Sequence, residues 1–572
     1  MLYEALQFVI HLTSLITIAQ SFLSSDRFCI ILSSRLASNR SSVYGIPIQT
    51  VYQRFCGKNY TLHNRERWNL FHYLGGNGPW IEKSNARFGT YEMEGKPSKG
   101  CIVDQLSRHA ERYPTKNAGA RHLALLSRLE SYTLNGSLSF LNNGDWTYFT
   151  PPTYPSFENL TTTSPYAGTL SAFTLGTKLR TRYPHLLPSQ SSTEPQDTPI
   201  NFWSASTPRD IETALYFADG LFGRDWSGSG TSPNSTVLPT ARLHIIPEHL
   251  SQGGNTLTPG RSCPNYITDE IQGRDKGYSK LAEWQAIFSK PIAERLSAEN
   301  PGLIDPSALA SSTGFTPVEI YSMMEMCGFE ILARGSDSDS ELRPSSSFSS
   351  SSSSEFSSPW CGLFTRSEWE DFAYARDLLH FYRAGPGNQF SGVMGSLWLD
   401  AVSRLLVQDS KATKGGGGSG EIYASFVHDG DIVPVLAALG VFDEDDNEDG
   451  AGGEEQVMPT DRVKRERNWR TGDLVPMAGR IIIERLNCRT PHGWRYRDVR
   501  LWINDGWVGW VVDGRTAEEK RRLKRERKVY IPQMEVGRFR DMVKGMKEKF
   551  GRFGEACGLP GGMEESIKFL HQ

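Results

Sequence analysis

The sequence predicts an α/β core into which a mostly helical domain is inserted. Short apolar runs typical of buried strands occur towards both ends of the chain, at 101–106, 241–246, 421–427, 480–486 and 498–503. Amphipathic helical patterns dominate the segment between 278 and 407. Strands that flank a long helical middle indicate a sheet-containing core with a separate helical domain.

Composition is that of a large globular protein. The chain has 572 residues, of which 38% are hydrophobic, enough for a sizeable core and several domains. Its 62 Lys and Arg residues nearly balance 65 Asp and Glu residues, for a net charge of −3, which excludes the basic footprint of a nucleic-acid-binding protein. The basic run Glu518–Lys528 is interpreted as a solvated helix face.

The N-terminus carries an apolar stretch from Ala5 to Leu23, with Thr17–Ala19 resembling a small-x-small cleavage site. We interpret residues 1–25 as a cleaved secretory signal peptide. A signal anchor, or a chain start assigned too early, remain the alternatives, because the n-region has Glu4 and no Lys or Arg. A membrane is a partner only if this segment is uncleaved.

The elements follow in order. Residues 40–100 are rich in Gly and aromatics and are expected to wrap the core, ahead of the strand at 101–106 and a helix over 121–132. Residues 135–200 are rich in Ser, Thr and Pro, which predicts a surface excursion with short helices. Thr207 and Pro208 fit the cap and first position of a helix that continues through Leu221.

The second half alternates structure with inserts. Helices are expected at 278–297, 317–332, 366–382, 395–407, 431–439 and 534–550. The Ser-rich run 336–358 cannot bury enough apolar surface to fold, and Gly415–Gly420 is a second flexible insert. The acidic loop 443–456 begins like a calcium-binding loop but ends in Gln456 instead of the bidentate Glu, so we interpret it as a solvated insert.

A histidine between two arginines follows the first core strand. Arg108, His109 and Arg112 are placed where the chain leaves the carboxyl end of this strand, which is where open α/β sheets bind ligands. Each guanidinium can grip two phosphate oxygens, and an imidazole kept neutral by their charge can attack phosphorus. Such a string is usually a solvated turn, so this interpretation depends on further pieces downstream.

Two such pieces are present. His428 and Asp429 end the strand 421–427, and an acid placed there can protonate a leaving alkoxide. Arg209 opens the helix after Thr207 and is a third candidate phosphate ligand, although spacing alone equally describes a surface arginine.

The run from Ser107 to Thr115 resembles the RHGxRxP signature of the histidine acid phosphatases, in the RHGERYPT form of secreted fungal acid phosphatases and phytases. The segment Trp68–Trp80 resembles the family's approach to that motif, and Phe426–Leu436 resembles its second signature. Two positions depart from the pattern: Ala110 replaces the family Gly, and Gly430 replaces a polar residue. Ala110 is expected to weaken activity if its position requires a positive φ or a close approach of the backbone to phosphate.

The resemblance implies a phosphoglycerate-mutase-like α/β core with an inserted helical cap. The core is expected to comprise residues 45–132, 196–260 and 415–560, and the cap residues 133–195 and 261–410. It also implies disulfides Cys101–Cys488, Cys263–Cys557 and Cys327–Cys361, leaving Cys29 and Cys56 unassigned among the eight cysteines. Sequons at Asn59, Asn135, Asn159 and Asn234, with a weaker candidate at Asn39, suit a secreted glycoprotein.

The resemblance implies a phosphatase without a cofactor or metal. His109 is expected to be the nucleophile and Asp429, kept protonated, the acid, while Arg108, Arg112, Arg209 and His428 bind the phosphoryl group. The sequence shows no clear basic cluster, with Lys116 read as a solvated loop residue, so a broad acid phosphatase is favoured over a phytase. A non-catalytic phosphate-binding relative and a membrane-anchored cell-surface glycoprotein remain alternatives.

Overall fold

The computed structural model divides the chain into two units, Met1–Asn69 and Leu70–Gln572. In the first unit only the paired strands β1 (Ser42–Val43) and β2 (Ile46–Pro47) and residues 68–69 are described. In the second, the structure describes residues 70–80, 102–142, 144, 146–151, 157–187, 199–227, 240–304, 314–335, 358–407, 421–440, 457–489, 495–511, 519 and 530–571.

Several sequence-based expectations fall outside these ranges. They concern the signal segment, most of the Ser-rich run, the Gly-rich insert, the acidic loop, Cys29, Cys56, Cys101, Asn39, Asn59 and Asn234. Cys488 lies on a described strand, but its side chain is not described, so the pairing of Cys101 with Cys488 stays a prediction. None of the described helices is long and apolar enough to span a lipid bilayer.

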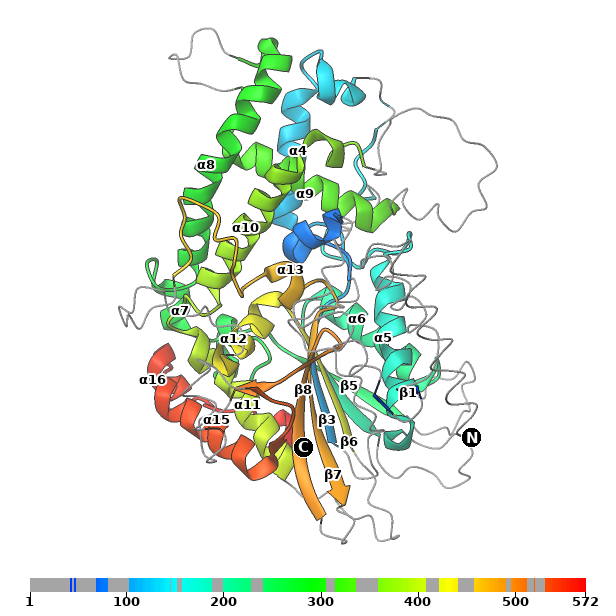
Figure 1. Ribbon diagram of the computed structural model, residues 1–572, viewed down its shortest axis with the longest axis vertical. Coiled ribbons are helices and arrows are strands. Elements are labelled where there is room, and N and C mark those ends of the chain that lie inside the picture. The colour runs from blue at the N-terminus through cyan, green and yellow to red at the C-terminus, as the bar shows by residue number, and fades with distance from the viewer. Residues whose placement is uncertain are drawn as a thin grey trace, which may run out of the picture. The chain divides into compact units, whose positions relative to one another are not determined.

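The second unit is built around a mixed eight-stranded sheet of strand order β12-β8-β7-β3-β6-β4-β5, with β9 paired to β8 (Figure 1). Strands β3, β6, β4 and β5 are parallel, whereas β7, β8, β9 and β12 join antiparallel. The strands span Ile102–Arg108 (β3), Ile200–Ala205 (β4), Ala241–Ile246 (β5), Glu421–Val427 (β6), Arg480–Arg489 (β7), Arg495–Ile503 (β8), Gly506–Val508 (β9) and Met534–Glu535 (β12). The mixed α/β fold class predicted from the sequence is confirmed.

The four parallel strands bring their carboxyl ends to one edge of the sheet. Arg108 is opposite Val427 in the register of β3 and β6, so the residues that follow these two strands start side by side. The backbone N–H of His109 donates to the carbonyl of Val427 at 2.9 Å, which extends the pairing by one residue. All the motifs identified in the sequence therefore lie at this edge.

Helices cover both faces of the sheet. On one face α5 (Gly168–Arg182) and α6 (Pro208–Phe222) pack against each other and the strands, through a buried cluster that includes Leu175, Phe217 and Phe426. On the other face lie α11 (Ser391–Val407), α12 (Asp429–Leu439) and α15 (Val536–Phe550) (Figure 1).

A helical layer extends beyond the carboxyl edge of the sheet. It contains α4 (Lys116–Leu129), α8 (Asp275–Glu299), α9 (Pro317–Arg334) and α10 (Arg366–Arg383), of which α8 packs on α9 and α10, and α4 on α9 (Figure 1). Both α9 and α10 start with a reciprocal capping box, Thr316 with Glu319 and Thr365 with Glu368, which satisfies backbone donors of the first turn.

Short elements complete the described part of the chain. They are α7 (Pro264–Thr268), α13 (Thr471–Leu474), α16 (Phe553–Cys557), β10 (Trp510–Val511) and its partner β11 (Tyr530–Ile531). Two disulfides are present, Cys263–Cys557 between the start of α7 and α16, and Cys327–Cys361 between α9 and the segment before α10. These are two of the three pairs that the resemblance implies, and the third, Cys101–Cys488, lies outside what the structure describes.

The structure corrects the expectation for residues 135–200. This segment is not only a surface excursion, because α5 buries Leu175 and Leu179 against the sheet. Helix α11 packs on α12 and α15, and α4 packs on α9. The division of the chain into core and cap stays a prediction.

Candidate active site

A cavity of about 830 Å³ opens at the carboxyl edge of the sheet, beneath the helical layer. It is lined by His109 and Arg112 after β3, by Arg209 at the start of α6, and by His428 and Asp429 after β6. Arg108 is wholly buried directly behind it. The tertiary structure thus brings together all six residues that the sequence selected as catalytic or substrate-binding.

His109 presents one ring nitrogen to the cavity. Its Nδ1 lies 2.9 Å from the carbonyl oxygen of Ala110, so Nδ1 carries the proton and Nε2 is left as the basic atom. The Nε–H of Arg112 points at this Nε2 from 3.4 Å. Burial, together with the charges of Arg108, Arg112 and Arg209, holds the pKa of His109 well below its usual 6.5.

The arginines are held by backbone carbonyls and by packing. Arg108 donates from Nη1 to the carbonyls of Gly76 at 2.7 Å and Val475 at 2.6 Å, and its Nη2 lies 3.0 Å from a carboxylate oxygen of Asp429. Arg112 donates to the carbonyl of Tyr113 at 2.8 Å, and burial and the two other arginines lower its pKa to about 9. It therefore stays charged at neutral and acid pH.

His428 lies between two carboxylates. Its Nδ1 is 3.1 Å from Asp210 and its Nε2 is 2.9 Å from Glu248, while Arg209 Nη2 also approaches Nδ1 at 3.1 Å. Burial would lower the pKa of His428, but the carboxylates of Asp210 and Glu248 outweigh it and the pKa is raised. These contacts favour an imidazolium, which is a second kind of cation facing the cavity.

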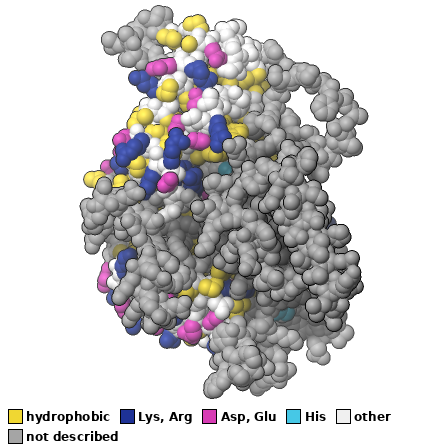
Figure 2. Space-filling view, viewed as in Figure 1, with side chains coloured by type: hydrophobic (Ala, Val, Ile, Leu, Met, Phe, Trp, Pro, Cys, Tyr) yellow, Lys and Arg dark blue, Asp and Glu magenta, His cyan; other side chains and the backbone are white. Residues whose placement is uncertain are grey.

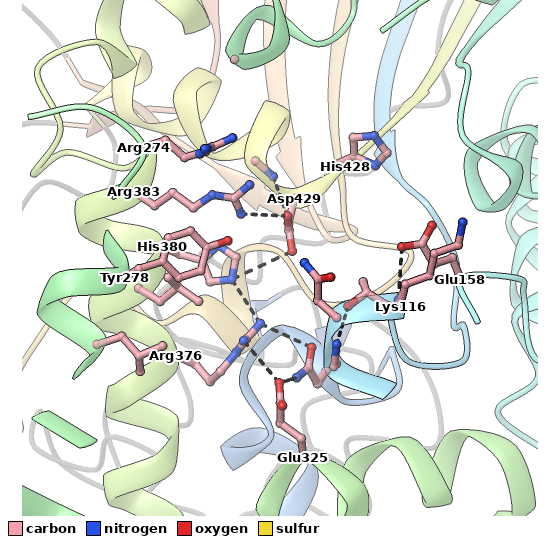
Figure 3. A pocket seen from close by; sticks show the side chains of 18 of the residues that line it. Lys116, Glu158, Arg274, Tyr278, Glu325, Arg376, His380, Arg383, His428 and Asp429 are labelled. Atoms are coloured by element: carbon pink, nitrogen blue, oxygen red, sulfur yellow. Dashed lines mark hydrogen bonds and ion pairs between the residues drawn. The ribbon is translucent and has the colours of Figure 1, made fainter. Parts of the chain in front are cut away.

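Asp429 is surrounded by basic side chains. Besides Arg108, its carboxylate lies 3.9 Å from His380 Nε2 and 4.0 Å from Arg383 Nη1 (Figure 3). Burial alone would raise the pKa of Asp429, but Arg108, His380 and Arg383 hold it well below the usual range. The expectation that Asp429 stays protonated is therefore wrong for the empty site.

Helix α10 supplies site residues that the sequence analysis missed. Arg376, His380 and Arg383 follow one another at spacings of four and three residues, so they share one helix face, and all three line the cavity (Figure 3). That spacing of basic residues in an otherwise buried helix was the signal available. Glu158, Asp210 and Glu248 were also missed, and nothing in their local sequence distinguishes them.

The cavity is more basic than the sequence indicated. Eight Lys and Arg side chains and five carboxylates line it, and the basic ones are Arg112, Lys116, Arg121, Arg209, Arg261, Arg274, Arg376 and Arg383. Lys116 is exposed but belongs to this lining. Within the described residues, the Nε–H groups of Arg209, Arg376 and Arg383 are buried without a hydrogen-bond partner, as suits a site that receives an anion.

Three further expectations can be compared with the structure. Ala110 is not among the residues with positive φ, does not line the cavity, and packs with Leu160, Ala172 and Ala478, so neither ground for a weakened site is present. Asn135 is exposed and Asn159 half-buried, and their glycosylation stays a prediction. Thr207 precedes α6 as expected, but its hydroxyl donates to Asp210 instead of capping the backbone.

Known proteins resemble this chain in sequence and in fold. A phytase of Candida albicans is 28% identical over 434 residues, covering 74% of this chain and 77% of its own, and an acid phosphatase of Komagataella pastoris is 28% identical over 473 residues, covering 81% and 84%. The crystal structure of the phytase from D. castellii has a TM-score of 0.66 and 25% sequence identity, covering 88% of this chain and 90% of that chain. The model of the histidine phosphatase superfamily (branch 2) matches residues 102–504. This chain is a member of the histidine phosphatase superfamily, branch 2.

Proposed function

We propose that this chain is an acid phosphatase that hydrolyses phosphomonoesters through a phosphohistidine formed on His109. The observation that carries the proposal is the state of that imidazole: Nδ1 is engaged by the Ala110 carbonyl, and burial together with three guanidiniums disfavours protonation of Nε2. A neutral, fixed imidazole facing an anion-binding cavity is a competent nucleophile towards phosphorus.

In the first step Nε2 of His109 attacks phosphorus and the bond to the ester oxygen breaks. Arg108, Arg112, Arg209 and His428 hold the three equatorial oxygens, where the charge remains high through a loose transition state. Water then attacks the phosphohistidine and gives a proton to Asp429, which the first step leaves ionised, while the P–N bond breaks and releases inorganic phosphate and the free imidazole. The guanidiniums and the imidazolium supply the charge for both steps.

The leaving oxygen needs a proton, which we assign to Asp429. In the empty site the neighbouring cations keep this carboxyl ionised. A bound phosphoryl group offsets those cations and raises the carboxyl pKa, and a phosphomonoester has a second pKa near 6. A substrate that binds as the monoanion therefore brings the proton that Asp429 passes to the leaving group.

This proton source sets the pH dependence. We expect kcat/KM to decline as the pH rises above about 6, because the substrate loses its second proton. His109 stays neutral well below its usual pKa, so activity extends into acid. A profile that stays flat from acid to neutral pH would count against the scheme.

The test is hydrolysis of p-nitrophenyl phosphate by the purified wild-type protein and by His109→Ala. We expect acid-pH turnover that falls by at least about 10³-fold in the variant, since a missing nucleophile leaves only binding and charge stabilisation. Rapid acid-sensitive labelling of the wild type by ³²P-labelled substrate, absent in the variant, would identify the phosphoenzyme. A His109→Ala variant with undiminished turnover would refute the proposal.

Phytate is the second candidate substrate. The eight cationic side chains around a cavity much larger than one phosphoryl group favour it, as does the similarity to phytases. We further propose secretion, supported by the N-terminal apolar segment, the sequons and the two disulfides.

A further inference from the structure

We propose that Glu158 is a specificity-determining residue that disfavours substrates with a second phosphate group beside the one being cleaved. This inference rests on the proposed phosphatase function and concerns its substrate class. Glu158 lies in the half-buried segment before Leu160 and lines the cavity opposite Asp429 and α10 (Figure 3).

The carboxylate of Glu158 points at the groups that would bind phosphate. One oxygen lies 3.4 Å from Nη1 of Arg209, and the other accepts from the backbone N–H of Lys116 at 3.4 Å, at the N-terminus of α4 (Figure 3). These are a guanidinium and a helix N-terminus, both of which attract anions. In the empty site Glu158 therefore occupies a position suited to a phosphate oxygen.

The backbone of Glu158 has a φ of +77°, in the left-handed region that residues with a β-carbon rarely adopt. Its conformation is fixed by its N–H donating to the Pro114 carbonyl at 2.9 Å and by the bridge between Arg112 and Leu160. A glycine or asparagine would adopt this backbone conformation with less strain, so a glutamate here destabilises the folded chain. Such outliers gather at functional sites.

The negative charge of Glu158 affects substrate choice because most of the other charged side chains of the cavity are basic. Lys116, Arg121, Arg274 and Arg383 also line the cavity, and together they would attract any polyphosphorylated ester. Glu158 is one-quarter exposed at its side chain, so its charge faces that space. The phosphate group of a monophosphate ester only has to displace the Glu158 carboxylate from Arg209. An ester with a second phosphate group also has to hold that group beside the carboxylate, at the cost of like-charge repulsion.

The experiment compares Glu158→Gln with the wild type in kcat/KM for phytate and for p-nitrophenyl phosphate. Glutamine keeps the size of the side chain and an oxygen that can accept from Lys116, but removes the charge. We expect the phytate-to-p-nitrophenyl phosphate ratio to rise roughly fivefold or more, the scale of one like-charge interaction in a partly solvated cavity. Glu158→Gly, which suits the positive φ, should shift the ratio in the same direction.

Glu212→Gln is the matched control. Glu212 accepts from the backbone N–H of Leu160 at 2.8 Å, so it supports the same segment, but it does not line the cavity. We expect this control to leave the ratio unchanged. An unchanged ratio in Glu158→Gln, or an equal rise in the control, would overturn the inference while leaving the phosphatase function intact.

Binding separates the two proposals further. In a His109→Ala background, the dissociation constants of phytate and inorganic phosphate can be measured by calorimetry without turnover. Addition of Glu158→Gln should lower the dissociation constant of phytate more than that of inorganic phosphate. If the wild type shows no turnover but Glu158→Gln still produces this shift in binding, the phosphatase function is refuted and the role of Glu158 is supported. Equal tightening of both ligands would refute the role of Glu158.

Discussion

Asp429 shows how a single residue changes its chemistry with its surroundings. Arg108, His380 and Arg383 converge on its carboxylate, so it is ionised in the empty site. In the proposed mechanism Arg108 also binds the phosphoryl group, and once that group is present the pull of Arg108 on the carboxylate is shared. The acid pH preference then follows from the protonation state of the substrate and not from the free enzyme's Asp429.

Substitution of Asp429 should depend on the leaving group. We expect Asp429→Asn to reduce kcat about 10²- to 10⁴-fold for an alkyl phosphate, the usual range for a lost general acid. The reduction should be much smaller for p-nitrophenyl phosphate, whose phenolate leaves without a proton. Parallel steady-state kinetics with glycerol phosphate and p-nitrophenyl phosphate provide the measurement, and equal losses on both would argue against the acid role.

At the scale of elements, helix α9 carries Glu325, Phe329 and Cys327 towards three different neighbours. Glu325 pairs with Arg121 of α4 at 2.7 Å, and the ring of Phe329 lies under the guanidinium of Arg112, 5.7 Å away. Cys327 ties the helix to Cys361, ahead of α10. This helix thereby connects the helical layer to Arg112, one of the arginines proposed to bind phosphate.

We expect the double variant Cys327→Ser/Cys361→Ser to be less stable than the wild type. The disulfide closes a loop of 34 residues, and by chain entropy its loss should cost about 4 kcal/mol. Thermal unfolding under non-reducing conditions should show a lower Tm for the variant. An unchanged Tm would mean that packing of α9 alone holds this region.

At the scale of the whole molecule, the sheet contains an acid that favours folding at low pH. Asp104 on β3 is fully buried, and neither carboxylate oxygen has a hydrogen-bond partner among the described residues. Burial raises its pKa from 3.8 to about 8. The folded chain therefore binds one proton more than the unfolded chain between these two values, so this group's contribution to stability decreases as pH rises from about 4 to about 8.

Replacing this acid should flatten the stability profile. We expect Asp104→Asn to remove a slope of up to about 1.4 kcal/mol per pH unit, the value for one proton, from the free energy of unfolding between pH 5 and 8. Denaturant unfolding of both proteins at several pH values measures the difference. Because Asp104 does not line the cavity, catalytic activity should be retained. Parallel curves for the two proteins would show that the carboxyl is not buried neutral.

The visible face of the helical layer carries charges of both signs. In Figure 2, Lys and Arg side chains are interspersed with acids over the described helices of the upper part. The chain is nearly neutral overall, with a net charge of −3, whereas the cavity lining has eight Lys and Arg side chains and five carboxylates.

The strand-rich core, the helical middle and the six candidate site residues could be predicted from the sequence, because periodicity and contiguous motifs are local properties. His109 with its two arginines, and His428 with Asp429, each lie within a few residues of a recognisable strand end. Long-range contacts alone place α5 against the sheet, bring Arg376, His380 and Arg383 to the same cavity, and pair Glu158 with Arg209. These facts depend on contacts between segments far apart in the chain, and the ionisation of Asp429 depends on the charges that those contacts bring together.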